Sequence, residues 1–236
     1  TYDALNRLAK KQGKTSAAAT AVSTLAAYLY DAGMYANVAK LNLIGRLSKV
    51  TDPSGSTEFF YDLLGRETKT VKIIAGASFT LQREFDPLNR LTRLLYPDRT
   101  DVRYAYSPQG ITRIHTVNAD GSASDFLSSA AYNPAGGTTR LEFGNGVATD
   151  YAYDPNTLRI AGIRTVSASN QPLQDLGYSF DAVGNLTALN DRRNSASQTF
   201  QYDALNRLRQ ASGGYGASSF RFDAPENRCF CLNDVA

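Results

Sequence analysis

A short sequence recurs along this chain and constrains its fold more than any other feature. The best copy reads FQYDALNRL at 200–208, and YDALNRL at 2–8 and FDPLNRL at 85–91 repeat it. Looser copies occupy 59–66 and 178–186, and degenerate ones occupy 104–110, 132–136 and 151–155. Because each repeat of such an array is one supersecondary unit, the repeat decides the architecture.

Each copy predicts a strand, a tight turn and a second strand. The aromatic-x-aromatic spacing places both rings on one face of a strand, where aromatic pairs stabilise a sheet. The next four residues, Asp-x-x-Gly or Asp-x-x-Asn, fit a type I turn, and five of the eight prolines, at 53, 87, 108, 134 and 155, stand second in such a tetrad. Gly or Asn in fourth place suits a left-handed residue in a three-residue loop closed by a bulge. The sequence therefore predicts an all-β fold, an array of antiparallel β-hairpins.

The residues that we single out serve the turns of this repeat. They are the aromatic residue before each turn, the Asp that opens it and, in most copies, the Gly or Asn in fourth place. They are Tyr2, Asp3, Asn6, Tyr61, Asp62, Gly65, Phe85, Asp86, Asn89, Tyr153, Asp154, Phe180, Asp181, Gly184, Tyr202, Asp203 and Asn206.

Composition and charge limit the alternatives. The 236 residues carry a net charge of +3 spread along the chain, which gives no case for nucleic acid or an acidic membrane surface. We expect one repeat region over 1–228. Within it, a degenerate Ala-rich stretch at about 9–27 forms a short helix or a poorly specified strand, too short and too polar for a membrane span. An irregular tail follows at 229–236. The chain opens inside a repeat, so we interpret it as a piece of something larger.

The sequence offers no convincing catalytic, cofactor-binding or metal-binding set. His115, the single histidine, sits in a strand pattern with no obvious Ser or Cys partner. Cys229 and Cys231 supply two of the four ligands that zinc normally takes, and their role stays open. The repeated Asp residues are explained by their turns. The run 144–146, GNG, lacks the Lys and the helix of a phosphate loop.

The repeated sequence resembles the tyrosine-aspartate (YD) repeat of the rearrangement-hotspot (Rhs) proteins. The B and C components of bacterial insecticidal toxin complexes and the animal teneurins share this repeat. The strongest matches are 45–55, 143–147, 178–187 and 200–208. The resemblance implies a long β-sheet ribbon that curves and spirals into a hollow shell. In bacterial members that shell encloses a toxic C-terminal polypeptide and is secreted or displayed at the cell surface. A chain of this length would be one arc of the wall, and its partners would be the other YD repeats and the enclosed toxin.

Many members also carry an aspartate-protease-like motif that releases the cargo. That motif pairs Asp-Pro-x-Gly elements around a tryptophan-containing segment, whereas this chain has no tryptophan and a single such element at 52–55. We therefore do not assign self-cleavage to it. Three hypotheses follow: a non-catalytic wall segment, which we favour; a binding module for carbohydrate or another cell-surface ligand, whose tyrosines would stack on sugar rings; and an enzyme, which would need a polar pocket that the sequence does not announce.

Overall fold

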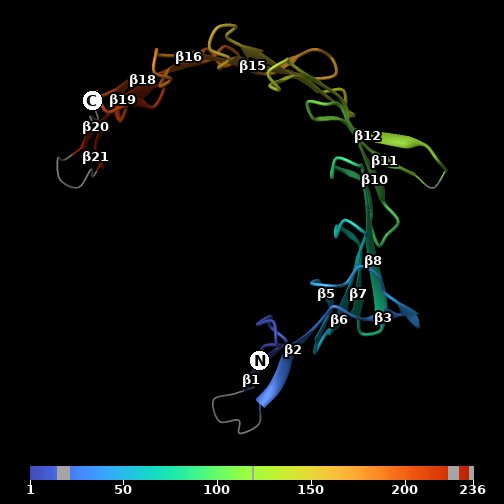
Figure 1. Cartoon of the computed structure of the whole chain (residues 1–236). Helices are drawn as coiled ribbons and strands as arrows, with labels where there is room; N and C mark the ends of the chain where they lie inside the picture. The colour runs from blue at the N-terminus through green and yellow to red at the C-terminus, as the bar shows by residue number, and fades with distance from the viewer. Residues whose placement is uncertain (15–21, 119, 223–228, 234–236) are drawn as a thin grey trace. The chain divides into compact units, whose positions relative to one another are not determined.

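The computed structural model describes residues 1–14, 22–118, 120–222 and 229–233, and its regular elements there are all β-strands (Figure 1). The chain divides into two compact units. Unit 1 comprises Thr1–Ala105 and His115–Ser124, and unit 2 comprises Tyr106–Ile114 and Asp125–Ala236. The predicted all-β class is confirmed.

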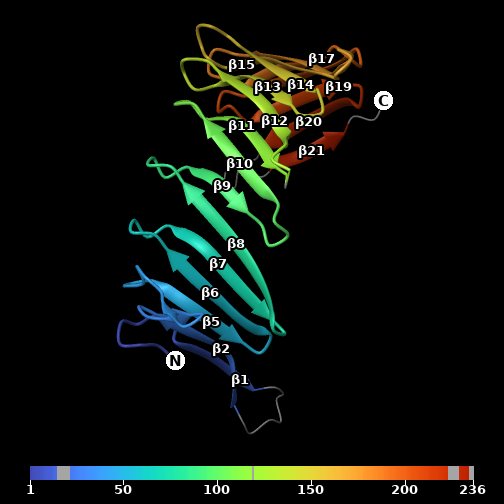
Figure 2. The same cartoon turned by 90° about the vertical axis from the view of Figure 1, so that its right-hand side faces the viewer.

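Unit 1 is built from successive antiparallel strands, each paired with the next (Figure 2). A separate two-stranded hairpin lies between β2 and β5 in the sequence. The strands are β1 (Lys10–Lys14), β2 (Val22–Tyr30), β3 (Met34–Tyr35), β4 (Val38–Ala39), β5 (Leu47–Asp52), β6 (Gly55–Tyr61), β7 (Glu67–Ile74), β8 (Ala77–Phe85), β9 (Leu91–Leu95) and β10 (Asp101–Tyr106).

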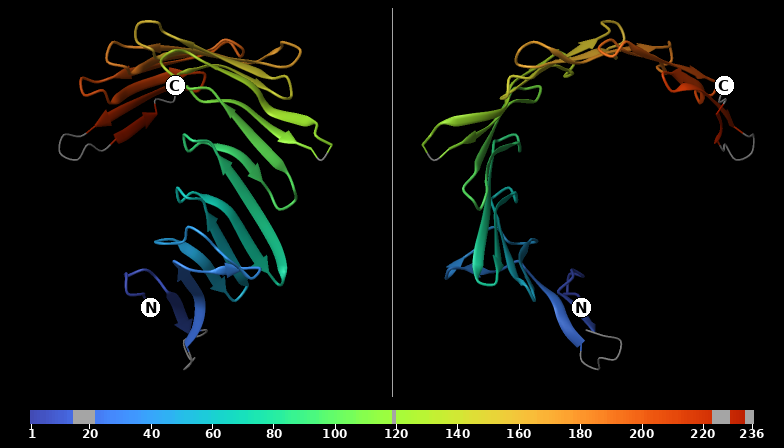
Figure 3. Two further views of the ribbon diagram at one scale, coloured as in Figure 1. Left: turned by 45° about the vertical axis from the view of Figure 1, so that its right-hand side comes forward. Right: turned by 180° about the vertical axis from the view of Figure 1, so that it is seen from behind.

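Unit 2 repeats the same antiparallel pattern, and its sheet is visibly curved (Figure 3). β11 (Ile111–Val117) and β12 (Ala123–Tyr132) contribute residues to both units. The remaining strands are β13 (Thr138–Phe143), β14 (Ala148–Tyr153), β15 (Ile160–Val166), β16 (Pro172–Phe180), β17 (Leu186–Asp191), β18 (Ala196–Tyr202), β19 (Leu208–Gly213), β20 (Gly216–Phe222) and β21 (Cys229–Asn233). Among the described strands β1 pairs with β2 and β21 with β20 at the ends of the series, so the sheet is open.

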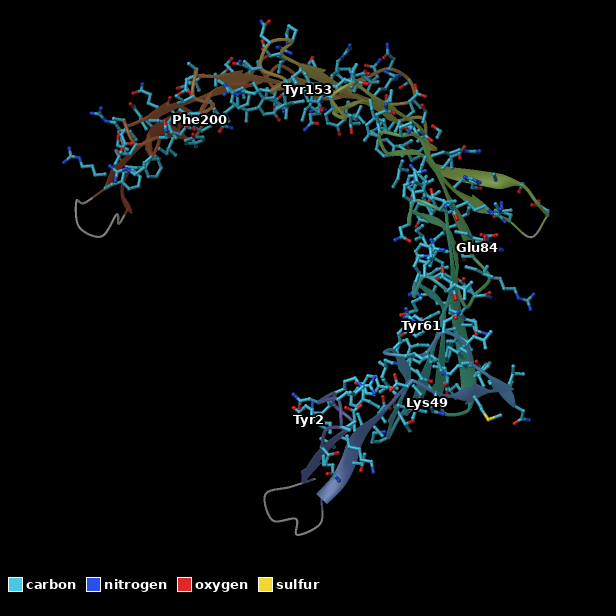
Figure 4. The ribbon with its side chains drawn as sticks, in the orientation of Figure 1. Tyr2, Lys49, Tyr61, Glu84, Tyr153 and Phe200 are labelled. Carbon is cyan, nitrogen blue, oxygen red and sulfur yellow. The ribbon has the colours of Figure 1, made fainter. Side chains whose placement is uncertain are left out.

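Each unit is a single layer of sheet, with side chains on both faces (Figure 4). Tyr61 and Glu84 lie on opposite sides of the unit 1 sheet. The buried apolar residues among those described are few and mostly small, the largest being Leu43 at 4% exposure and the most covered Val71 at 1%. Apart from the β3–β4 hairpin, no second layer covers the described strands, so strand pairing and contacts between neighbouring side chains must supply most of the stability.

For the Ala-rich stretch the strand is found and not the helix, and the expectation of an irregular tail is corrected. Within the Ala-rich stretch at 9–27, the described residues form β1 and most of β2, so they are strand and not helix, while 15–21 lie outside the described residues. The tail expected to be irregular at 229–236 contains β21, which pairs with β20 from Phe222↔Cys229 to Ser218↔Asn233. A strand can form on backbone hydrogen bonds alone, which a repeat pattern does not report. The turn of the last copy, at 223–228, lies outside the described residues.

Candidate functional site

The turns of the repeat share one hydrogen-bonded frame, which Asp62 illustrates. Its backbone amide donates to the carbonyl of Arg66 at 3.0 Å, and the amide of Gly65 donates to the carbonyl of Asp62 at 3.0 Å. Its carboxylate Oδ1 accepts the amides of Leu64 at 2.9 Å and Arg66 at 3.0 Å. Gly65 has φ +83°. The loop thus has three residues and ends in a left-handed one, and the register of its two strands shifts between Phe60 and Tyr61, just before the loop.

The same frame recurs at 3–7, 86–90 and 203–207, where Asn6, Asn89 and Asn206 are the left-handed residues at φ +59° to +68°. At 181–185 Gly184 takes this place at φ +103°. The copy at Asp154 differs, because its loop is one residue longer. The amide of Asp154 donates to the carbonyl of Arg159, and Leu158 is the left-handed residue at φ +57°.

An arginine four residues after the Asp completes the turn. Arg66 Nε donates to Asp62 Oδ2 at 2.6 Å, and the equivalent pairs are Arg7–Asp3 at 2.8 Å, Arg90–Asp86 at 2.7 Å and Arg207–Asp203 at 2.7 Å. The backbone amide of Arg90 and its guanidinium hold the pKa of Asp86 below its ordinary value. The carboxylate therefore fixes both the turn and the direction of the guanidinium.

That guanidinium reaches the next copy of the repeat. The Cζ of Arg66 lies 5.1 Å from the ring centroid of Phe85, and its Nη1 donates to the carbonyl of Asp86 at 2.9 Å and to Asn89 Oδ1 at 3.1 Å. We call this arrangement the turn clamp: the Asp, the Arg that it orients, and the aromatic residue of the next copy. Arg7–Tyr30 at 4.4 Å and Arg207–Phe222 at 4.5 Å repeat this arrangement, and Arg46–Tyr61 at 5.8 Å and Arg159–Phe180 at 6.0 Å repeat its contact between arginine and ring.

One copy uses an asparagine in place of the arginine. Asn185 Nδ2 donates to Asp181 Oδ2 at 2.9 Å and to Asn206 Oδ1 of the next turn at 2.9 Å. The amide thus makes the same two connections as the guanidinium, within its own turn and to the following one, but without covering an aromatic ring.

Tyrosine at the aromatic position adds a hydrogen bond to the preceding copy. The hydroxyl of Tyr61 donates to the carbonyl of Leu47 at 2.9 Å, and that of Tyr153 to the carbonyl of Thr138 at 2.9 Å. Tyr30 and Tyr132 do the same to Leu8 and Ile111. Phe85 and Phe180 have no hydroxyl, so at those copies arginine stacking and the carbonyl of the following Asp provide the connection. The predicted Tyr2 is 67% exposed, and Tyr202 ends β18 half-buried.

A further repeat turn carries an insertion that the sequence pattern conceals. The amide of Asp31 donates to the carbonyl of Arg46 at 3.1 Å, the amide of Gly45 donates to Asp31 Oδ1 at 2.7 Å, and Gly45 is left-handed at φ +76°. The bond from the Asp31 amide to Arg46 and the left-handed Gly45 are those of an ordinary repeat turn, with residues 32–44 and the β3–β4 hairpin inserted between its two halves, whereas the carboxylate of Asp31 pairs with Arg7 and not with Arg46. The two halves of the repeat motif are present in the sequence as Tyr30-Asp31 and Gly45-Arg46, but the inserted residues between them conceal the motif.

A buried ion pair fastens this insertion to the sheet. Lys40 Nζ lies 2.8 Å from Glu58 Oε2 and donates to the carbonyl of Ser48 at 2.5 Å, and the two charged side chains are 1% and 4% exposed. Lys49 contacts the other carboxylate oxygen at 2.8 Å. Burial opposes the ionisation of Glu58, but the hydrogen bonds from the two lysines outweigh it, so its pKa lies below the ordinary value.

A hollow of about 930 Å³ lies between the insertion and the sheet. Tyr35 and Phe60 meet there edge to face at 5.3 Å, with Lys69 Nζ 4.1 Å from the Phe60 centroid. Its lining carries neither His nor Cys. His115 lies on β11 with a buried Nδ1 that has no hydrogen-bond partner among the described residues.

The described residues contain no group of three or more His, Cys, Asp and Glu side chains arranged to hold a metal ion. In the same part of the chain, no helix is long and apolar enough to cross a membrane. The side chains of Cys229 and Cys231 lie outside what the structure describes.

Comparison with known proteins finds an Rhs repeat model and two toxin subunits that are similar in sequence. The family model described as RHS Repeat matches residues 42–72 and 180–218. The toxin subunit YenC2 of Yersinia entomophaga is 37% identical over 100 residues, which cover 35% of this chain and 10% of that protein. The toxin subunit YenC1 of the same organism is 33% identical over 127 residues, 47% of this chain and 13% of that protein.

Solved structures extend the similarity to nearly the whole fold. A crystal structure of TcdB2-TccC3 matches with a TM-score of 0.71 and 20% identity, covering 96% of this chain and 14% of that one. A structure of the Tc holotoxin pore of Photorhabdus luminescens matches with a TM-score of 0.65 and 18% identity, covering 95% and 14%. The chain thus spans between a tenth and a seventh of the length of these proteins.

Proposed function

Because the chain belongs to the Rhs/YD-repeat family, we propose that it forms a length of the wall of a β-sheet shell that encloses a C-terminal toxin polypeptide and helps to deliver it. Its role in this proposal is structural and non-catalytic. The other YD repeats of a longer protein are its partners, together with the enclosed polypeptide, and the protein acts outside the producing cell or at its surface.

The observation that carries the proposal is the turn clamp. A single-layer sheet has no second layer to hold its strands in place, so each copy needs a fixed connection to the next. The clamp supplies this within each unit: Arg66 connects the turn of one copy to Phe85 and the carbonyl of Asp86 in the following copy. Arg159 makes the corresponding contacts to Phe180 and the carbonyl of Asp181.

The use of charge also supports a wall. Of the singled-out aspartates, Asp62, Asp86 and Asp203 are each paired with an arginine and bonded to backbone amides, which occupies their acceptor oxygens. A carboxyl group that acts as a general acid near neutral pH needs a raised pKa, whereas the pKa of Asp203 is lowered by Arg207 and by backbone amides. These carboxylates are suited to permanent structural pairing.

A chimera tests the proposal. The segment of YenC2 that matches this chain would be replaced by the matching segment of this chain, and the product compared with unmodified YenC2 by sedimentation and by limited proteolysis. A wall segment should give the same sedimentation coefficient and protect the same C-terminal region from protease. A chimera that sediments normally but loses that protection would argue against enclosure, and one that unfolds would argue against interchangeable wall segments.

A matched variant sharpens the comparison. The exchanged segment should contain residues 42–72, which the RHS Repeat model matches. In that chimera Arg66→Ala removes one clamp, whereas Lys72→Ala removes an exposed cation from strand β7. If clamps hold the wall, only the first variant should increase cleavage of the C-terminal region. The second hypothesis, carbohydrate binding, has no observation in its favour beyond the number of tyrosines.

A further inference from the structure

The insertion at 32–44 is more than a repeat turn needs. The turn that follows Asp62 joins its two strands with a three-residue loop, whereas the turn that follows Asp31 carries the β3–β4 hairpin as well. The hairpin is also fastened to the sheet by the buried pair Lys40–Glu58. Insertions in a repeat protein often form its binding face, so the hollow between this insertion and the sheet is a candidate site.

The floor of the hollow is a row of side chains across three neighbouring strands of unit 1. Phe60 on β6 is paired with Lys69 on β7, and Lys69 is paired with Gln82 on β8. Residues that are directly opposite in a sheet point to the same face, so these three side chains stand side by side. The ring of Tyr35 from the insertion meets the ring of Phe60 at 90°, with the centroids 5.3 Å apart. The two rings form a corner against which a flat ring can pack.

The insertion supplies an apolar wall beside this corner. Val38 and Leu41 line the hollow and are 68% and 74% exposed, so a bound apolar group would remove their surface from water. The volume of about 930 Å³ falls in the range of roughly 300–1,000 Å³ that small-molecule sites occupy. Such sites combine apolar walls with a few polar groups that fix the orientation of the ligand.

One cation in the lining has no carboxylate partner among the described residues. The ammonium of Lys69 lies 4.1 Å from the ring centroid of Phe60 and 5.2 Å from that of Tyr35. Aromatic rings attract and orient an ammonium but carry no counter-charge. The other cations of the lining are paired, Lys40 with Glu58, Arg66 with Asp62 and Arg83 with Glu67. An anion that enters the hollow therefore meets one unpaired positive charge.

The polar groups of the lining favour a ligand with a single negative charge. Asp62 and Glu84 also line the hollow, and each already has an arginine partner. A carboxylate can accept hydrogen bonds from the ammonium of Lys69 and from the amide of the neighbouring Gln82. A dianion would leave one of its charges unmatched near two carboxylates.

We propose that the hollow between the insertion and strands β6, β7 and β8 binds a small aromatic monocarboxylate. Its carboxylate is held by Lys69 and Gln82, and its ring packs against Tyr35, Val38 and Leu41. This site goes beyond the wall proposal and does not depend on an enclosed polypeptide.

Fluorescence anisotropy of an indole probe tests the proposal. The chain has no tryptophan, so the indole of indole-3-propanoate is the one indole in the sample. Titration with the 236-residue chain should raise its anisotropy with a Kd of about 0.1–1 mM, the scale for a ligand of this size. The neutral analogue indole-3-propanamide should bind at least ~10-fold more weakly, because it cannot form the charged hydrogen bond to Lys69.

Variants separate the charge of the site from its shape. Lys69→Met keeps the length of the side chain, so it should weaken binding of the carboxylate at least ~10-fold and leave binding of the amide unchanged. Lys72→Met is the matched control, since Lys72 is an exposed lysine of the same strand, and it should change neither affinity. Val38→Ser with Leu41→Ser should weaken binding of both probes, because it removes the apolar wall.

Three results would each overturn the proposal. They are no rise in the anisotropy of indole-3-propanoate with the chain at ~1 mM, equal affinities for the acid and the amide, and equal effects of Lys69→Met and Lys72→Met. The concentration is set by the expected Kd. Far-UV circular dichroism checks that each variant is folded, and unchanged binding of the amide by Lys69→Met shows that the hollow itself is intact.

Discussion

Arg66 lies with its guanidinium carbon 5.1 Å from the ring centroid of Phe85, 19 residues further along the chain, while its Nε is held 2.6 Å from Asp62 in its own turn. One side chain therefore belongs to two copies of the repeat. The relation recurs with Arg7 and Tyr30 in unit 1 and with Arg207 and Phe222 in unit 2. It explains why a basic residue follows the turn in the strongest copies.

Removing one clamp should destabilise the fold. Arg66→Ala loses a cation–π contact and its hydrogen bonds to Asp86 and Asn89, and it leaves the Asp62 carboxylate without its ion pair, so we expect a loss of about 1–3 kcal/mol in the free energy of unfolding. Arg66→Lys keeps the positive charge but loses the planar guanidinium. Its free energy of unfolding should therefore lie between those of the wild type and Arg66→Ala. Urea denaturation measures this. A change within ~0.5 kcal/mol for Arg66→Ala, the range of ordinary surface substitutions, would contradict the clamp.

Two glycines with the same backbone conformation separate turn strain from clamp contact. Gly65 and Gly76 both have φ +83°, but a Cβ at Gly65 would lie 2.2 Å from Arg46 Nη2, whereas one at Gly76 meets nothing within 4 Å. Gly76→Ala should cost about 1–2 kcal/mol from the left-handed conformation alone. Gly65→Ala should cost more, by up to ~1 kcal/mol, because the flexible end of the Arg46 side chain must move off the turn. Equal urea midpoints for the two variants would show that Arg46 has no fixed place there. Gly65→Val and Gly184→Val should be worse still, since β-branched residues resist positive φ.

The turn carboxylates should make stability sensitive to acid. The pKa of Asp86 is lowered by the amide and guanidinium of Arg90, and that of Asp203 by the side chain and amide of Arg207. A folded pKa below the unfolded value of about 3.9 means that the stabilisation is present above that pH and is lost as the pH falls through the lower, folded value. The urea midpoint should therefore decline below about pH 4, and less steeply in the variant Asp86→Asn with Asp203→Asn. Parallel pH profiles for the two chains would contradict this assignment.

The inserted hairpin should depend on the Lys40–Glu58 pair. Glu58→Ala leaves a buried lysine without its carboxylate, which typically costs about 3–5 kcal/mol, so the variant should be much less stable and residues 32–44 more open to protease. Lys40→Met with Glu58→Leu removes both charges and should recover much of the loss. Thermolysin digestion followed by mass spectrometry locates the cleavage, with Lys72→Ala as the exposed-lysine control. If the double variant is cleaved as fast as Glu58→Ala, the ion pair is not what fastens the hairpin.

The repeat made much of this fold predictable. A period of two with paired aromatics specifies a strand, and Asp-x-x-Asn with proline in second place specifies a turn, because both depend on contacts between residues close in sequence. The all-β class and the antiparallel hairpins followed from those rules. The strand at Cys229–Asn233 did not, since its support comes from the backbone of β20.

The composition of the clamp was only half visible in the sequence. The aromatic residue, the Asp and the left-handed residue stand together and were singled out, and the arginine was noted only as a basic residue after the turn. Its two partners lie four residues before it and about twenty residues after it, and only the pairing of strands brings the second one near. The insertion at 32–44 was not predicted for the same reason, since Asp31 and Gly45 are neighbours only in the folded turn.

In the best copies of the repeat, the local geometry follows from the sequence alone: which residues extend, where the turn falls and which Gly or Asn takes positive φ. These depend on steric rules and on hydrogen bonds within five or six residues. Only the tertiary structure decided which guanidinium covers which ring, that Lys40 reaches Glu58, and that Tyr35, Lys69 and Gln82 line one hollow. Those relations arise when strand pairing sets residues from different copies side by side, at distances that the spacing along the chain does not contain.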